Sequence, residues 1–131
     1  MPHVSKYRLK PKQEENLLSV LKITFTKTKN AEEMENFITF LLSPTEQLMF
    51  AKRIGIAILV KEGLPEIDIA DKLGVTRETV LRIKLLMQVR GNGFEVAIKR
   101  LREEKRLNEF KKFLIALGRY SVRAAGGYVK P

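Results

Sequence analysis

The sequence contains no cysteine, and its only histidine is His3, close to the N-terminus. Without cysteine the chain cannot form disulfide bonds, thiolate zinc sites or thiol redox centres. One histidine near a chain end, where mobility is common, does not provide a cluster of metal ligands. We therefore expect no metal site built by the protein and no tightly bound cofactor.

Long apolar runs are also missing. The longest stretch, from Ile54 to Val60, is far too short to span a bilayer, which takes about 20 apolar residues in a helix. The N-terminal residues lack the charged start, apolar run and small-residue cleavage site of a secretory signal. We predict that the protein has no membrane span or membrane partner and that it is cytoplasmic.

Acidic residues are scarce at both ends of the chain, which has 131 residues and a formal net charge of +10. Residues 1–12 carry four basic side chains and no acidic one, and residues 91–131 carry ten Lys or Arg against four Glu. Residues 13–63, in contrast, are slightly acidic. A positive field of this kind favours a polyanion as partner, with a generally basic soluble surface as the alternative.

Apolar residues recur at helical spacing through most of the chain, and the apolar fraction of 44% is enough for a core. Asn30, followed by Glu33, and Ser43, followed by Pro44 and Glu46, are typical of helix starts. The spacing predicts helices over residues 13–28, 31–42, 44–62 and 94–117, the last with a joint within the charged residues 102–106 or none. Gly91, Asn92 and Gly93 predict a break in the chain before residue 94. These patterns predict an all-α fold, and the chain shows no catalytic fingerprint.

Residues 67–88 carry the most specific pattern of the chain. Five apolar residues can pack two short helices against each other, and Ala70 permits a close crossing. Gly74 can take the left-handed conformation between the helices, and Thr76 can cap the second one. The apolar positions are Ile69, Leu73, Val75, Val80 and Ile83. This pattern predicts a helix-turn-helix that reads DNA in the major groove, with a hairpin that merely packs inside a bundle as the alternative.

The second helix of this motif provides the candidate DNA contacts. An arginine can donate two hydrogen bonds to guanine, a glutamate can accept from cytosine, and a threonine suits a thymine methyl or a phosphate. Predicted base contacts are Thr76, Arg77, Glu78, Thr79 and Arg82. Predicted phosphate contacts are Lys72, Lys84 and Arg90, which would set the register on the duplex without reading its sequence.

From about Gln13 to Gln88 the order of segments resembles the Trp repressor superfamily, and within it the Trp repressor-like proteins. The matching pieces are Leu42–Glu46, Leu73–Gly74 and Thr79–Arg82, and residues 90–94 (RGNGF) look like the continuation found in the repressor-like branch. The resemblance implies an all-helical, intertwined homodimer with two helix-turn-helix heads on double-stranded DNA. Together with the composition of the two chain ends, the match predicts four segments: a basic arm at 1–12, a dimerisation and DNA-binding domain at 13–90, a helical extension at 91–120 and a flexible basic tail at 121–131.

In the family's tryptophan sensor, two arginines hold the ligand, and by residue matching they are similar to Arg53 and Arg82, beside a hydroxyl at Ser43. The glycine that leaves room for the indole is replaced here by Ile83, and a nearby serine by Leu86. Bulky aliphatic side chains should fill that slot. A small-molecule corepressor at Ser43, Arg53 and Arg82 stays open, whereas tryptophan is disfavoured.

Together these features predict a sequence-specific transcriptional regulator, with repression as the expected sign, and not an enzyme. Two alternatives remain. The chain could be a DNA-docking accessory domain of a transposition or replication protein. It could also be a helical protein-interaction module that binds a partner through Phe94, Ile98, Phe110 and Phe113, with the hairpin only as scaffold.

Overall fold

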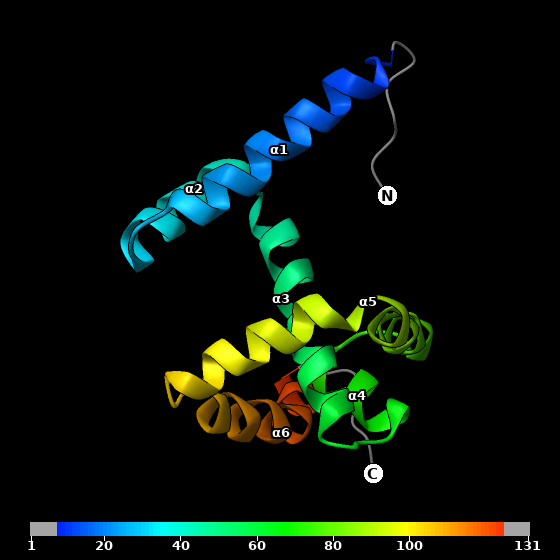
Figure 1. Cartoon of the computed structure of the whole chain (residues 1–131). Helices are drawn as coiled ribbons and strands as arrows, with labels where there is room; N and C mark the ends of the chain where they lie inside the picture. The colour runs from blue at the N-terminus through cyan, green and yellow to red at the C-terminus, as the bar shows by residue number, and fades with distance from the viewer. Residues whose placement is uncertain (1–7, 125–131) are drawn as a thin grey trace. The chain divides into compact units, whose positions relative to one another are not determined.

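The computed structural model describes residues 8–124, with side chains up to Leu117. Within that range the chain is all-helical, as the sequence predicts, and contains no strand (Figure 1). Two compact units divide the chain, one ending at Thr45 and the other beginning at Glu46. The helices are α1 (Pro11–Lys27), α2 (Ala31–Leu41), α3 (Pro44–Lys61), α4 (Glu66–Leu73), α5 (Arg77–Glu103) and α6 (Leu107–Ala124).

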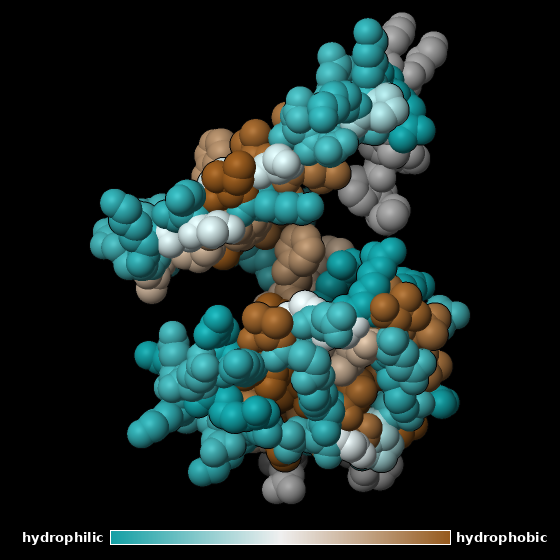
Figure 2. All heavy atoms as spheres, viewed as in Figure 1, coloured by the Kyte–Doolittle hydropathy of each residue, from teal (hydrophilic) through white to brown (hydrophobic). Residues whose placement is uncertain are grey.

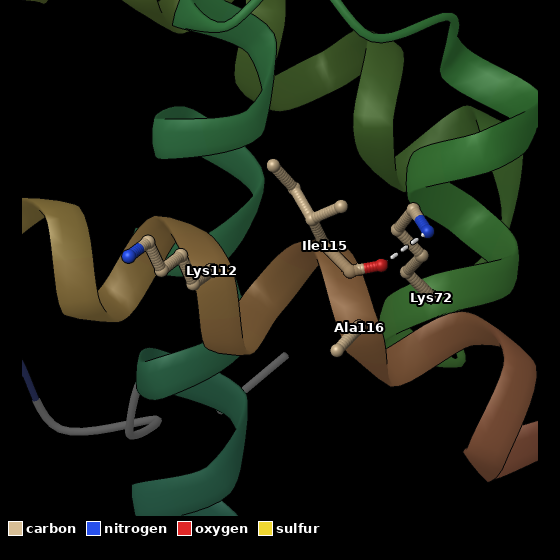
Figure 3. Close-up of a pocket in the computed structure, with 4 residues that line it drawn as sticks. All are labelled: Lys72, Lys112, Ile115 and Ala116. Carbon is tan, nitrogen blue, oxygen red and sulfur yellow. Dashed lines mark hydrogen bonds between the residues drawn. The ribbon is translucent and has the colours of Figure 1, made fainter.

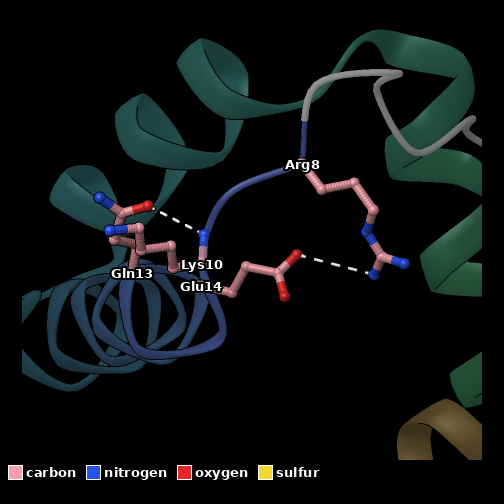
Figure 4. Close-up of polar contacts among 4 residues, drawn as sticks. All are labelled: Arg8, Lys10, Gln13 and Glu14. Atoms are coloured by element: carbon pink, nitrogen blue, oxygen red, sulfur yellow. Dashed lines mark hydrogen bonds and ion pairs between the residues drawn. The ribbon is translucent and has the colours of Figure 1, made fainter.

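Helix α1 begins inside the predicted basic arm, at Pro11, because proline suits the first helical turn. The backbone N–H of Lys10 donates to Gln13 Oε1 at 2.9 Å, and Arg8 lies 3.9 Å from Glu14 (Figure 4). The ion pair is exposed to water, so it adds little stability, whereas the glutamine satisfies a backbone donor at the helix start.

The N-terminal unit consists of α1 and α2, which meet at Phe25 and Phe37. Their rings are edge to face, with centroids 5.1 Å apart. As predicted, Asn30 caps α2 by accepting a 2.9 Å hydrogen bond from the N–H of Glu33. Neither helix contains a buried residue, although both carry a wide apolar face. Figure 2 shows these apolar side chains as brown spheres along the unit.

The C-terminal unit has a continuous core. The centre of α3 contributes five successive buried residues, from Gly55 to Leu59, as its apolar character on most sides predicts. The other helices add one or a few buried side chains each: Ile69, Ala70, Leu73, Val80, Ile83, Ile98, Leu107 and Leu114.

Gly55 is a point of close approach in this core. A Cβ atom there would lie 3.3 Å from Leu114 Cδ2 and 3.3 Å from Leu73 Cδ1. Most real Cβ contacts are longer, so α3 can approach α4 and α6 this closely only because the residue has no side chain. Helix α6 is therefore part of the core of its unit.

The break predicted at Gly91–Gly93 lies one residue earlier, at Arg90. Arg90 leaves helical geometry, with φ −131° and ψ 30°, and this bend divides α5 into two helical segments, the second of which includes Gly91 and Gly93. Farther along, α5 ends at Glu103 and α6 starts at Leu107, with Lys105 at a φ of 59° between them. Of the two forms predicted for residues 94–117, the chain adopts the one with a joint at 102–106.

Candidate nucleic-acid interface

The α4–α5 corner, residues 66–90, is formed by a glycine conformation and local hydrogen bonds, of which the sequence predicts the glycine and the cap. Gly74 has φ 62° and ψ 48°, the left-handed conformation that ends α4. The N–H of Val75 then donates to the carbonyl of Ala70 at 3.1 Å. Thr76 Oγ1 accepts a 3.1 Å hydrogen bond from the N–H of Thr79 and so caps α5. The turn between the helices is tight because Gly74 adopts the left-handed conformation and Thr76 accepts a hydrogen bond from a backbone N–H at the start of α5.

One side of each helix in the corner is sealed into the core. Ile69 and Val80 are completely buried, and Leu73 and Ile83 are nearly so. Since these side chains fix one face of α5, the opposite face of its first turns must point to solvent. One side of the corner therefore packs on the core, and the other side is exposed to solvent.

The predicted base contacts lie mainly on the open side. Thr76, Arg77, Glu78 and Arg82 are all exposed at or near the start of α5. Thr79 differs, because it is half-buried and its hydroxyl lies 2.9 Å from that of Thr76. Arg77, Glu78 and Arg82 can therefore reach a ligand in front of α5, whereas the hydroxyls of Thr76 and Thr79 are engaged with each other and Thr76 also caps the helix.

The predicted phosphate contacts are in three different environments. Arg90 is exposed at the bend of α5, and Lys84 is exposed with its ammonium 3.9 Å from Glu66. Lys72 is half-buried and turned toward α6, where its Nζ donates to the carbonyl of Ile115 at 2.6 Å (Figure 3). Lys72 borders a hollow of about 420 Å³ with Lys112 and Ala116, and its ammonium holds α6 against α4.

The sequence analysis missed an apolar stripe on the open side of α5. Leu81, Leu85 and Val89 have exposed fractions of 44%, 59% and 71%. Counting residues from the Thr76 cap would have found them, because positions four apart lie on one helix face. The stripe lies among the exposed Glu78 and Arg82 side chains.

The three residues considered for an effector do not share an element. Ser43 belongs to the N-terminal unit, and Arg53 and Arg82 belong to the C-terminal unit. The Arg53 guanidinium lies over the Phe50 ring, 5.6 Å from its centroid. Ile83 is buried in the core, whereas Leu86 is exposed. Only one of the two aliphatic side chains expected to fill the indole slot is therefore packed.

The aromatic residues considered for a protein contact also separate. Ile98 is buried and Phe94 packs against the core, so neither is free to bind a partner. Phe110 and Phe113 are 42% and 61% exposed and border an apolar groove of about 350 Å³ between α3 and α6. The other residues along this groove are Ala51, Ile54, Gly55, Ile58, Leu101 and Leu114.

Between residues 8 and 124, no helix has both the length and the apolar character needed to cross a membrane. In the same part of the chain, no three His, Cys, Asp or Glu side chains come together as a group that could hold a metal ion. The tail predicted for residues 121–131 lies largely outside the described residues.

Comparison with known proteins gives one match. Residues 15–102 match the family of the Trp repressor protein, a segment that starts in α1, ends in α5 and leaves α6 outside. No curated protein and no solved structure matched the chain. Since the match covers about two thirds of the sequence, the chain belongs to the Trp repressor family, whose members are DNA-binding regulators and not enzymes.

Proposed function

We propose that this protein is a sequence-specific transcriptional regulator that inserts the start of α5 into the major groove of double-stranded DNA. The observation that carries the proposal is the two-sidedness of α5: Val80 and Ile83 are buried, while Arg77, Glu78 and Arg82 are exposed. This two-sidedness supports a helix-turn-helix, a motif in which the first turns of the second helix contact base edges.

Phosphate contacts would come from the basic side chains around the corner. Arg90 is free to reach the backbone of the duplex, and Lys84 can exchange its long, exposed contact with Glu66 for a phosphate. Lys72 is a weaker candidate because its ammonium already bonds to Ile115. Such contacts position the protein and make binding salt-dependent.

We further propose that the protein acts as a homodimer joined through α1, α2 and the first half of α3. The apolar side chains of the N-terminal unit find no cover within it, since neither α1 nor α2 has a buried residue. A second copy can cover them by contributing the same faces. Two heads related by two-fold symmetry then require a symmetric operator with half-site centres about 34 Å apart.

Regulation by tryptophan is not part of the proposal. Ile83 occupies the core position that resembles the glycine beside the indole, and its side chain takes space that the ligand would need. The free protein is expected to bind its operator without tryptophan, and repression by blocking a promoter is the simplest outcome of such binding.

Selection of bound sites from random duplex DNA by the purified protein tests the function. The expected product is a pseudo-palindrome with half-sites one helical turn apart. Arg77→Ala should weaken binding to that site by about 1–3 kcal/mol and relax the preference at one base pair. Equal loss on selected and random DNA would instead make Arg77 a phosphate contact, and failure to enrich any sequence would reject the function.

A protein-interaction module is the second candidate, and the apolar groove beside Phe110 and Phe113 favours it. In that case Phe113→Ala would abolish partner binding, while Arg77→Ala would have no effect on any activity. The two functions are separated by a gel shift on genomic fragments, since only the regulator retards selected fragments over others.

A further inference from the structure

The open face of α5 has an apolar centre. Successive helical residues are turned by about 100°, so Leu85 points roughly 160° away from Ile83 and roughly 140° away from Val80. Leu81 precedes Leu85 by one turn on the same face. Because Val80 and Ile83 are buried, Leu85 projects almost directly away from the core, while Leu81, about 100° from Val80 and about 160° from Ile83, projects outward and to the side, in agreement with the larger exposed fraction of Leu85.

These leucines do not contribute to the fold of the corner. The buried side chains that join α4 to α5 lie on the other side of the helix, and neither leucine belongs to the core or packs against it. Polar side chains would be more favourable on an exposed face, because an exposed leucine keeps its apolar surface in water and gains no free energy from burial. An apolar pair here therefore points to a binding partner.

Charged side chains border this apolar centre. Arg77 and Arg82 are exposed on the same turns, and the part of α5 before the bend at Arg90 carries three basic residues, Arg77, Arg82 and Lys84, against one acidic residue, Glu78. A partner that fits must offer apolar groups in the middle and negative charge at its sides. Duplex DNA offers both, because thymine presents its C5-methyl group in the major groove and phosphates line the groove edges.

We propose that Leu81 and Leu85 contact thymine methyl groups and thereby select thymine at one or two positions in each half-site. This inference rests on the proposed DNA-binding function and adds a specificity that the arginines and Glu78 cannot supply. Both leucines lie within the first three turns of α5, the part of a recognition helix that meets base edges. Val89 lies about 18 Å along the helix from Arg77, next to the bend at Arg90, and is not part of the contact.

Replacing thymine by deoxyuridine tests the contact, because it removes only the methyl group. The selected operator is synthesised with each thymine in turn replaced, and dissociation constants are measured for the full-length protein. We expect about fourfold weaker binding at the contacted positions, the factor that corresponds to roughly 0.8 kcal/mol for one buried carbon group. Leu81→Ala and Leu85→Ala should each bind the thymine and deoxyuridine forms equally at one of these positions.

Val96→Ala is the matched control, since Val96 is an exposed apolar residue of α5 beyond the bend. This variant should keep the full sensitivity to deoxyuridine. The inference is wrong if wild-type protein binds every deoxyuridine operator as well as the thymine operator, or if both alanine variants keep the sensitivity. In either case the proposed function survives, because a selected operator exists.

Two further outcomes would reject the DNA-binding function itself or the assignment of DNA as the partner of the leucines. If selection enriches no sequence at all, the DNA-binding function and the methyl contact fall together. If Leu81→Ala or Leu85→Ala changes the sedimentation of the protein without DNA, the leucines form a contact between protein chains and the thymine assignment is wrong. Unchanged sedimentation together with lost methyl sensitivity supports the assignment.

Discussion

The two units of this chain use apolar residues in opposite ways. In the C-terminal unit, Ile56 and Leu59 are completely buried and belong to a core shared by four helices. In the N-terminal unit, α1 and α2 have no buried residue, although Leu17, Leu21 and Phe40 give them broad apolar faces. The C-terminal unit therefore has a buried core of its own, besides some exposed apolar side chains, whereas α1 and α2 have no buried core.

This difference fits the two roles in the proposed function, DNA binding by the C-terminal unit and dimerisation by the N-terminal unit. A head that must present α5 to DNA needs a rigid base, which the core around α3 and α4 provides. A unit that joins two copies needs apolar surface left over after its own helices have formed. Substitutions in each unit can test whether the exposed faces of the N-terminal unit join two copies and how stable the C-terminal unit is.

The largest effect is expected from charges on the α1 face. Leu17→Lys combined with Leu21→Lys should dissociate the proposed homodimer, since covering each leucine is worth about 1.5–3 kcal/mol. Sedimentation velocity should show monomers at concentrations where the wild type is expected to be dimeric. Val96→Lys places one such charge on an exposed site of the other unit and should leave the proposed dimer intact. A double variant that remains dimeric would end the proposed role of α1.

The next effect concerns the core of the C-terminal unit. Leu59 is fully buried, so Leu59→Ala should lower the free energy of unfolding by about 2–5 kcal/mol through lost transfer energy and a cavity. Urea unfolding of the full chain at fixed concentration measures this loss. Val96→Ala, which truncates an exposed side chain in the same unit, should change stability by less than about 0.5 kcal/mol. Similar losses in both variants would contradict the assigned core.

Two glycines of the C-terminal unit should respond in opposite directions. Gly74 has a positive φ and ordinary space for a Cβ, so Gly74→Ala should cost about 1–2 kcal/mol through backbone strain alone. Gly93 lies inside α5 with no atom within 4 Å of the Cβ position, so Gly93→Ala should stabilise the helix by roughly 0.5–1 kcal/mol. Urea midpoints measure both. Destabilisation by Gly93→Ala would show that the chain must break there.

The parts of the fold that the sequence predicts correctly depend on local chemistry. Asn30, Gly74 and Thr76 act on backbone groups within four residues, and their roles hold whatever the rest of the chain does. The break predicted at Gly91–Gly93 by the same reasoning is found one residue earlier, at Arg90. Gly91 and Gly93 themselves belong to the helical segment that follows, in which Phe94 and Ile98 pack on the core, so tertiary contacts outweigh the low helix propensity of glycine there.

The candidate site is predictable in part for the same reason. The start of α5 and its exposed Arg77 and Glu78 follow from the Thr76 cap. The contact of Lys72 with Ile115 joins residues 43 positions apart, so no local pattern indicates it. The exposure of Leu81 and Leu85 likewise depends on which face of α5 the core takes.

A small effect, similar in size to that of Gly93→Ala, is expected at Lys72, where it decides whether the ammonium group holds α6 or binds DNA. Lys72→Met keeps most of the length and removes the ammonium that donates to the Ile115 carbonyl at 2.6 Å. Because the site is half open to water, stability should fall by only about 1 kcal/mol in urea unfolding. The salt slope of DNA binding should not change, since the ammonium already has a partner, whereas Arg90→Met should reduce it. If Lys72→Met flattens the slope as Arg90→Met does, the Lys72 ammonium leaves the Ile115 carbonyl to bind phosphate. Its hydrogen bond is then not a fixed link between α4 and α6 in the C-terminal unit.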